Sequence, residues 1–245
     1  MSFYAKRMVY VMDRFDNLLS KLRKCCEKYG MINEGAKVLC AVSGGKDSLA
    51  LAAGMQALSR FYPKRFTVSA LTVDMGFEGV DFSGVTAFLN GRGIGYTVIK
   101  TDISKAVAEL DRPCSLCARM RRAAICSYAS ENGYDTVALG HTEDDAAETA
   151  LMNLLYGGKF ETLDPCFEYE DKGVRIIRPL LMTNERLIIK LAAELDFPIL
   201  KNPCGKENDS ARDEVRKIIS GADRTCRGAA HRIASAVYDG KDGKN

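Results

Sequence analysis

Long apolar runs are absent from this 245-residue sequence. A helix that crosses a membrane needs roughly 18 or more consecutive apolar residues, and no such run occurs. The N-terminal segment carries Lys6, Arg7, Asp13, Arg14 and Asp16, which is too much charge for the apolar centre of a secretion signal. These absences predict a cytoplasmic protein that does not enter a membrane.

Two common nucleotide-binding patterns are also missing. A Walker A loop has four residues between its first glycine and the Gly-Lys-Ser/Thr triplet, and the dinucleotide fingerprint is G-x-G-x-x-G. The sequence contains neither pattern. It also has no second C-x-x-C to complete a zinc ribbon with Cys114 and Cys117, and no obvious glutaminase segment that would supply ammonia.

A large excess of charge is lacking, since the net charge is only +3. Its distribution is uneven: residues 1–30 carry +4, residues 31–170 carry −5 and residues 171–245 carry +4. Basic ends around an acidic middle suit a bound polyanion, and ordinary solvated surface explains a charge of this size equally well. A local basic cluster is formed by Arg119, Arg121 and Arg122.

The composition is that of a globular protein, with 47% hydrophobic and 27% charged residues. This length suits one sizeable α/β domain with appendages, or one domain with a small second one. Nine cysteines in a chain expected in the cytoplasm indicate thiols and metal ligands rather than a disulfide framework.

A glycine loop, Ser43-Gly44-Gly45-Lys46-Asp47-Ser48, is the feature around which the chain is organised. It follows an apolar run at 37–42 and precedes helical spacing at 49–58, so it lies at a strand-to-helix turn. Glycines let the backbone approach a ligand closely, and the first N–H groups of a helix point at an anion. The loop therefore predicts a phosphate-binding site, with a serine-capped Gly-Gly turn as the simpler alternative.

The hydrophobic pattern predicts a doubly wound α/β fold with a parallel sheet. An amphipathic helix is expected over 8–29, with Met12, Leu18 and Leu22 on its apolar face. Strands are expected at 37–42, 66–73, 95–100 and 135–139, and helices at 83–92 and 114–128. Strands that alternate with helices form parallel sheets with right-handed crossovers. We divide the chain into an N-terminal helical segment (1–33), an α/β domain (34–200) and a helical extension (201–245).

Three loops should meet where ligands bind in such sheets, at the carboxyl ends of the strands. They are the glycine loop, the loop that begins at Asp74, and the loop that contains Gly140, His141 and Asp145. Asp74 can accept a hydrogen bond from adenosine, and Asp145 can hold magnesium beside phosphates. Alternatively Asp144 and Asp145 cap the following helix, and His141 is either a phosphate donor or a buried structural histidine.

The cysteines suggest a metal site. Cys114 and Cys117 lie at i and i+3 in the first turn of a predicted helix, where thiols ligate or attack readily. A single C-x-x-C fits a redox pair, a zinc half-site or an iron–sulfur half-site. Cys204, in the turn-forming context Asn202-Pro203-Cys204-Gly205, is the best third ligand. Cys40 is expected in the core, and any of the remaining five cysteines can supply a fourth ligand.

The glycine loop resembles the PP-loop of ATP pyrophosphatases. A closer resemblance, to the TtcA-type tRNA 2-thiocytidine synthetases, runs from about residue 29 to about residue 219. It is carried by segments 43–48, 114–122, 139–153, 156–159 and 178–180 and by Cys204. Three features depart from the family pattern: Asn202-Pro203 stands where a further cysteine is usual, His141-Thr142 replaces a histidine pair, and the C-terminal part is shorter.

The resemblance implies an ATP-dependent tRNA thiolase in which Cys114, Cys117 and Cys204 hold a [4Fe–4S] cluster. ATP and magnesium are then bound by Ser43, Gly44, Gly45, Lys46, Asp47, Ser48, Asp74, Gly140, His141 and Asp145, with Lys46, Asp47 and Asp145 also catalytic. Its partners are tRNA and a sulfur donor such as a cysteine desulfurase; monomer and homodimer are both open.

Two other functions stay open at this point. One is an enzyme that adenylates a small amide or carboxylate and whose cysteines hold structural zinc. The other is an RNA-binding or sensor protein that binds nucleotide without turnover.

Overall fold

The computed structural model describes residues 3–108, 110, 114–201, 204 and 210–242. Six strands form one sheet in the order β3-β2-β1-β4-β6-β5. Their bounds are β1 Ala36–Ala41, β2 Phe66–Asp74, β3 Gly95–Lys100, β4 Thr136–Ala138, β5 Cys166–Tyr169 and β6 Val174–Ile177. The chain proceeds from β1 outward to β3 and then returns to β4 on the other side of β1. The switch in strand order therefore lies between β1 and β4.

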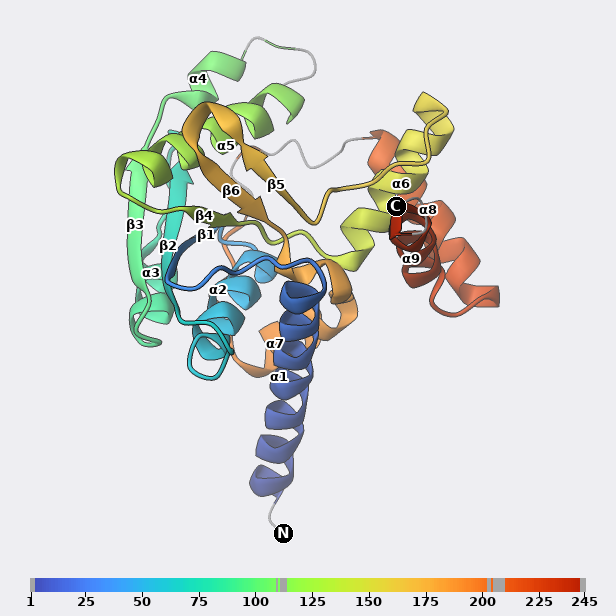
Figure 1. The fold of residues 1–245 in the computed structure, drawn as a ribbon, viewed down its shortest axis with the longest axis horizontal. Coiled ribbons are helices and arrows are strands. Elements are labelled where there is room, and N and C mark those ends of the chain that lie inside the picture. Colours follow the sequence, from blue (N-terminus) through green and yellow to red (C-terminus); the bar gives the residue numbers. More distant parts are fainter. Residues whose placement is uncertain (1–2, 109, 111–113, 202–203, 205–209, 243–245) are drawn as a thin grey trace.

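Helices cover both faces of the sheet (Figure 1). One face carries α1 Phe3–Lys28, α2 Lys46–Leu58, α3 Ser83–Asn90 and α7 Glu185–Glu194. The other carries α5 Cys114–Glu131, with the short α4 Ile103–Val107 beside it. The remaining helices are α6 Glu143–Gly157, α8 Ser210–Thr225 and α9 Ala229–Asp242, and two 3₁₀ turns lie at Glu170–Lys172 and Pro179–Met182. The layers are those expected of a doubly wound sheet.

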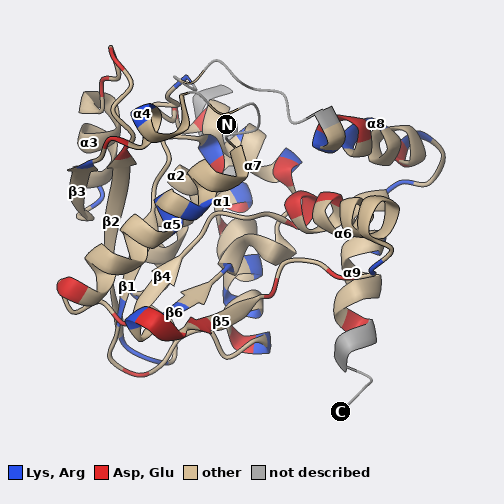
Figure 2. Cartoon of the chain, turned by 90° about the horizontal axis from the view of Figure 1, so that it is seen from above, with Lys and Arg blue, Asp and Glu red and all other residues tan. Residues whose placement is uncertain are grey.

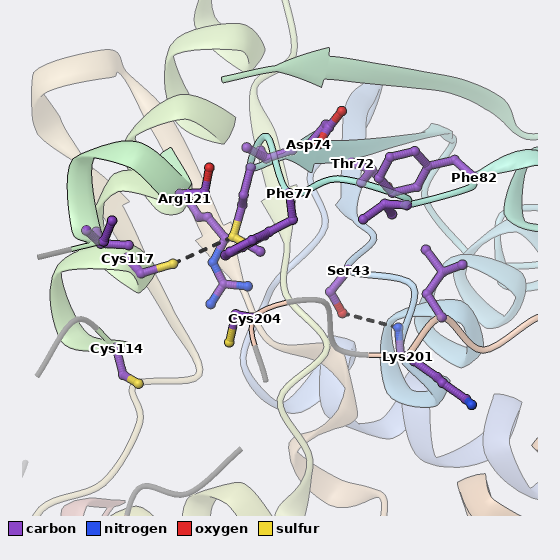
Figure 3. A pocket seen from close by; sticks show the side chains of 18 residues that line it. Ser43, Thr72, Asp74, Phe77, Phe82, Cys114, Cys117, Arg121, Lys201 and Cys204 are labelled. Carbon is purple, nitrogen blue, oxygen red and sulfur yellow. Dashed lines mark hydrogen bonds between the residues drawn. The ribbon is translucent and has the colours of Figure 1, made fainter. Parts of the chain in front are cut away.

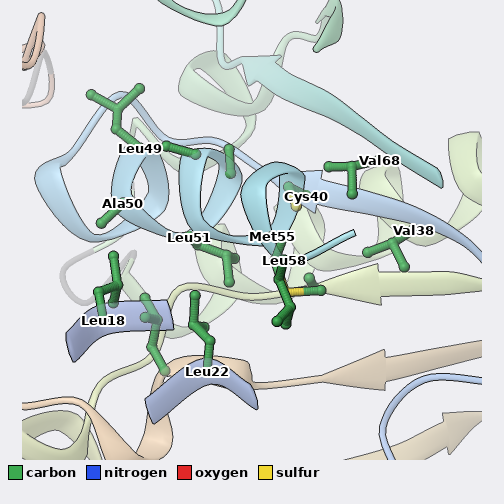
Figure 4. Packing of buried hydrophobic residues seen from close by; sticks show 14 of the residues in the cluster. Leu18, Leu22, Val38, Cys40, Leu49, Ala50, Leu51, Met55, Leu58 and Val68 are labelled. Atoms are coloured by element: carbon green, nitrogen blue, oxygen red, sulfur yellow. The ribbon is translucent and has the colours of Figure 1, made fainter. Parts of the chain in front are cut away.

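The main core lies between the sheet, α1 and α2 (Figure 4). Leu18 and Leu22 of α1 pack against α2, and both are fully buried. A side chain on Gly54 of α2 would collide with Leu22, so this glycine lets the two helices approach closely. Cys40 is buried within β1 as expected, and burial raises the pKa of its thiol to about 12.

The N-terminal helix is amphipathic over only part of its length. Met12 was expected on the buried face, but its side chain is 62% exposed. Figure 1 shows the reason, because the first half of α1 runs out beyond the sheet and α2. The helix packs on the domain from Phe15 onward.

Strands β5 and β6 were not predicted. They form a short hairpin, and β5 pairs antiparallel with β6, whereas every other pairing is parallel. Each strand has only four residues. An antiparallel edge strand on an otherwise parallel sheet is common in doubly wound folds.

The helices α6, α8 and α9 pack together beside the sheet (Figure 2). His231 of α9 contacts Glu143 in the first turn of α6, with 2.6 Å between Nδ1 and Oε1. Tyr238 of α9 reaches the main core and donates a hydrogen bond to the backbone oxygen of Leu163. No helix among the described residues is both long and apolar enough to cross a membrane.

Candidate active site

The glycine loop joins β1 to α2 at the centre of the sheet. Gly44 has φ +83°, a conformation that favours glycine, and its backbone oxygen accepts a hydrogen bond from the N–H of Leu200. Ser48 is buried, and its hydroxyl donates to the backbone oxygen of Gly45 and accepts from the N–H of Ser43. Ser48 therefore stabilises the conformation of the loop through two backbone groups.

The loop after β4 approaches the glycine loop closely. A Cβ atom on Gly140 would lie 3.2 Å from both Cα and N of Ser48, within the first turn of α2. Contact with a backbone cannot be relieved by turning a side chain, so only glycine fits here without a shift. Gly140 thus lets the loops after β1 and β4 meet at the switch in strand order, as expected.

Two cavities open on the glycine loop. The first, of about 460 Å³, is lined by Ser43, Gly45, Thr72, Val73, Asp74, Met75, Phe77, Val80, Phe82, Ser104, Val107, Ala108, Cys114, Cys117, Arg121, Leu200, Lys201 and Cys204. We call it the cysteine cavity. The second, of about 390 Å³, is lined by Ala41, Val42, Ser43, Gly45, Asp47, Ser48, Leu71, Val73, Met75, Ala118, Arg121, Arg122, Ile125, Leu139, Gly140, His141, Asp145 and Arg212. We call it the polar cavity. The two share lining residues, so they are neighbouring parts of one cleft.

The three predicted metal ligands line the cysteine cavity together (Figure 3). Cys114 and Cys117 come from the first turn of α5, and Cys204 comes from the segment before α8. The Cys117 sulfur lies 3.6 Å from the sulfur of Met75, which follows β2. Sequence reasoning thus found thiols that the fold brings to one cavity with the glycine loop.

The thiols do not form a closed ligand set. Among the described residues, no three His, Cys, Asp or Glu side chains are placed to hold one metal ion. The turn expected around Cys204, with Pro203 and Gly205, lies outside the described residues. The other six cysteines, all of them described, do not line the cavity, and none of the nine forms a disulfide. Three thiols facing one cavity suit an iron–sulfur cluster with one open iron, provided that their side chains turn toward a common centre.

Lys46 points elsewhere than expected. Its ammonium lies 3.0 Å from Asp47 Oδ2 and 2.6 Å from Glu185 Oε1, and it lines neither of the two cavities. Burial disfavours the charge of Lys46, but Glu185 and Asp47 outweigh it and raise its pKa. Glu185, the first residue of α7, gave no signal in the sequence.

Asp47, the carboxylate of the loop, has one oxygen paired with Lys46 and one without a partner. Its Oδ1 is buried without a hydrogen bond to any described residue, and it lines the polar cavity. Burial raises the pKa of Asp47, Lys46 opposes this, and the negative charge of Asp145 adds to the rise. Two carboxylates beside an anion site suit Mg²⁺, which takes one or two carboxylates together with phosphate oxygens.

Asp145 serves as a helix cap and also lines the polar cavity. Its Oδ2 accepts from the N–H of Thr142 at 2.8 Å, and Thr142 in turn caps the Asp145 N–H, which completes a capping box. Asp144 accepts from the N–H of Glu185 at 2.6 Å and does not line either cavity. The capping alternative therefore holds for Asp145, its magnesium role stays a prediction, and Asp144 joins α6 to α7.

His141 is held as a neutral donor. Its Nδ1 accepts a hydrogen bond from Nε of the buried Arg178 at 3.3 Å, so the ring proton resides on Nε2. Burial lowers the pKa of His141 to about 4, with Arg178 as the next cause. The ring lines the polar cavity, where its Nε2–H can donate to a phosphate oxygen.

The charged contacts between α6 and α8 were not predicted, although Glu148 lies in the segment 139–153 that carries the family resemblance. Glu148 of α6 is buried and accepts from Nε of Arg216 at 2.8 Å. Arg212, one turn earlier on α8, lies 3.7 Å from Glu148 and 3.8 Å from Asp145, and it lines the polar cavity. Charged residues on a helix are normally solvated surface, so their spacing gave no signal.

A family model described as "PP-loop domain" matches residues 14–222. The tRNA-cytidine(32) 2-sulfurtransferase of Dechloromonas aromatica is 34% identical over 236 residues, covering 91% of this chain and 82% of that protein. The Coxiella burnetii protein of the same name is 35% identical over 208 residues, covering 83% and 81%.

Among solved structures, the chain is similar to the U34-tRNA thiolase NcsA from Methanococcus maripaludis with its [4Fe-4S] cluster. The TM-score is 0.76 at 25% identity, covering 93% of this chain and 80% of that one. NMN synthetase from Francisella tularensis, at 16% identity and a TM-score of 0.51, shares the fold. From the match over most of its length, the chain belongs to the PP-loop family and, within it, to the tRNA-cytidine 2-sulfurtransferases, which are enzymes.

Proposed function

We propose that the protein uses ATP to replace the C2 oxygen of a tRNA cytidine, in the anticodon loop, with sulfur. The observation that carries the proposal is that Cys114, Cys117 and Cys204 line a cavity that shares Ser43 and Gly45 with the phosphate loop. Activation by ATP and delivery of sulfur need to occur at the same carbon, so the two sites must adjoin. A tRNA substrate also agrees with the expected cytoplasmic location.

The first step is adenylation. The C2 oxygen of the base attacks the α-phosphorus of ATP, the bond to the β-phosphate oxygen breaks, and pyrophosphate leaves. The free N–H groups at the start of α2 and the His141 Nε2–H stabilise the charge that develops on the phosphates. Asp47 and Asp145 would hold Mg²⁺, which supplies further charge stabilisation. Asp74, in the cysteine cavity, would accept a hydrogen bond from the adenosine.

The second step is displacement of AMP. A sulfur anion forms a bond to the activated carbon, and the C–O bond breaks with the original oxygen leaving on AMP. Cys114, Cys117 and Cys204 would hold a [4Fe–4S] cluster, which supplies a carrier for that sulfur. Phe77 and Phe82, in the cavity lining, present aromatic surface against which a base can stack. The sulfur itself would come from a donor such as a cysteine desulfurase.

The extension 201–245 has two roles in this proposal. It brings Cys204 to the α/β domain (34–200), and α8 brings Arg212 to the polar cavity. The basic side chains of α5 and of the two chain ends would hold the tRNA backbone.

The test is a reconstituted reaction with unmodified tRNA, ATP and a sulfide source, using protein purified without oxygen. We expect pyrophosphate release that depends on tRNA, 2-thiocytidine in the digested tRNA, and iron with labile sulfide in the protein. In Cys114→Ser, iron and thiolation should be lost while pyrophosphate release persists, because the ATP site is intact. Cys226→Ser is the matched control, since that thiol lies outside the cavity.

The results separate the rival functions. Zinc without iron or labile sulfide favours an enzyme that adenylates a small molecule. Nucleotide binding without any pyrophosphate release favours a binding module. If cells that lack the protein keep every thiolated nucleoside in their tRNA, the assigned substrate is wrong.

A further inference from the structure

Three arginines line the polar cavity together with the glycine loop. Arg121 and Arg122 belong to α5, and Arg212 belongs to α8. Gly45 and Ser48, at the N-terminus of α2, line the same cavity. Guanidinium groups and a helix N-terminus that line one cavity are suited to an anion with several charged oxygens.

Arg212 differs from the other arginine that pairs with Glu148. Arg216 donates to Glu148 at 2.8 Å and 3.3 Å, within or near hydrogen-bond distance. The ion pairs of Arg212, at 3.7 Å to Glu148 and 3.8 Å to Asp145, are longer than hydrogen bonds. Arg216 does not line the cavity and Arg212 does. Arg216 therefore fixes α8 to α6, while Arg212 is aimed at the cavity by carboxylates that do not hold it tightly.

We propose that Arg212 binds the polyphosphate of ATP and so links the C-terminal extension to the nucleotide. The inference rests on the proposed function, because it assigns a further ligand to the same ATP site. A phosphate oxygen gives the guanidinium a charged partner at hydrogen-bond distance, which the present carboxylates do not.

The movement of Arg212 also affects Asp145. In the ligand-free cleft Arg212 lies beside Asp145 Oδ1, the oxygen that does not cap Thr142. When Arg212 turns to the polyphosphate, this oxygen is released to face a cation that accompanies the nucleotide. ATP binding then gives α8 a further contact with the α/β domain through Arg212.

The test compares two variants on the same helix, Arg212→Gln and Arg216→Gln. Isothermal titration with ATP and with AMP measures their affinities in the presence of magnesium. Losing charge-assisted hydrogen bonds should weaken ATP binding to Arg212→Gln by about 10- to 100-fold. AMP lacks the outer phosphates, so its affinity should change by less than about twofold. Arg212→Lys should recover part of the loss, because it restores the charge without the fork of donors.

Arg216→Gln controls for damage to the helix packing. It removes the tighter bonds to Glu148, so it should lower the thermal midpoint more than Arg212→Gln does, yet keep wild-type ATP affinity. Three results would overturn the inference while leaving the ATP site itself in place. They are equally weakened ATP binding in both variants, equal losses of ATP and AMP affinity in Arg212→Gln, and unchanged ATP affinity in Arg212→Gln. A wild-type protein that binds no ATP would instead contradict the proposed function.

Hydrogen exchange gives a second measurement that needs no variant. We expect ATP to slow exchange of the amides of α8, and AMP to leave them unchanged. Protection confined to the glycine loop and α2 would mean that the extension does not respond to the polyphosphate, and the inference would be wrong.

Discussion

The ammonium of Lys46 lies 2.6 Å from the carboxylate of Glu185, which is 139 residues later in the chain. The contact joins the glycine loop to the start of α7, and it directs the lysine of the phosphate-binding motif away from both cavities. Asp144 binds the backbone N–H of the same Glu185, so α2, α6 and α7 meet at this residue. If Lys46 binds a phosphate, as the motif predicts, it must first leave Glu185.

Glu185→Gln should therefore strengthen ATP binding. The pair is partly exposed, so breaking it costs about 0.2–1 kcal/mol, and removing that cost should tighten ATP binding by up to about fivefold. The backbone bond to Asp144 does not depend on the side chain, so the variant should fold normally. Titration with ATP measures the change in affinity. In protein that also carries Lys46→Ala, Glu185→Gln should no longer strengthen ATP binding. Weaker ATP binding in Glu185→Gln would indicate that Lys46 acts through Glu185 and does not contact phosphate.

His141 should make stability depend on pH. Burial and Arg178 hold its pKa near 4, with Arg122 and Arg212 acting in the same direction and Asp145 opposing them. The unfolded chain takes up a proton near pH 6.5 and the folded chain does not, so the free energy of unfolding falls as the pH drops from about 6.5 toward 4. The slope from this group is at most about 1.4 kcal/mol per pH unit.

Urea unfolding between pH 7 and pH 5 measures this slope. His141→Gln should remove the part of the slope that His141 contributes. Plots of the free energy of unfolding against pH for the wild type and the variant should therefore converge as the pH falls. Parallel curves would show that His141 takes up its proton equally in the folded and unfolded chain.

Gly44→Ala should destabilise the protein, and Gly45→Ala should not. At Gly44 the φ of +83° strains any residue with a side chain, and the new Cβ would lie 2.6 Å from Leu200 Cδ1. At Gly45 φ is −78°, and the new Cβ would meet only Ser43 Oγ at 3.5 Å. The free energy of unfolding should fall by about 1–3 kcal/mol in Gly44→Ala and by under about 1 kcal/mol in Gly45→Ala. Thermal unfolding of both variants measures the difference, and equal losses would contradict it.

Much of the fold and of the cleft could be predicted because the signals are local. The glycine loop, strands β1 to β4 and the thiol pair of α5 each show a pattern within about ten residues. Cys204 was predicted from its neighbours and from the family resemblance, and the fold brings it to the same cavity. The hairpin β5–β6 escaped prediction because each of its four-residue strands is interrupted by a charged residue, Glu168 or Arg175, whereas β4 lies in an uncharged run at 136–139.

The contacts that tune the cleft could not be predicted because they are long-range. Glu185 approaches Lys46 only through the packing of α7 on α2, and Arg178 meets His141 across a separation of 37 residues. Arg212 is an ordinary charged residue of an amphipathic helix until α8 is placed beside α6. Motifs identify which groups react, whereas the direction in which Lys46 points depends on tertiary structure.

Glu148→Gln should loosen the C-terminal helices. The carboxylate is buried on α6, and its bonds to Arg216 are the tightest charged contact between α6 and α8 among the described residues. Burial raises the pKa of Glu148 and the Arg216 bond opposes that rise, so the charge is retained mainly through this partner. Losing the bond should lower the free energy of unfolding by about 1–3 kcal/mol.

The matched control is Glu214→Gln. Its partner Lys217 is on the same exposed face of α8, so this variant should lower the free energy of unfolding by less than about 0.5 kcal/mol. Urea unfolding measures both variants, and hydrogen exchange should show the Glu148→Gln loss concentrated in α8. Equal costs would mean that the buried carboxylate does not secure the extension, and that α8 is held by its apolar contacts alone.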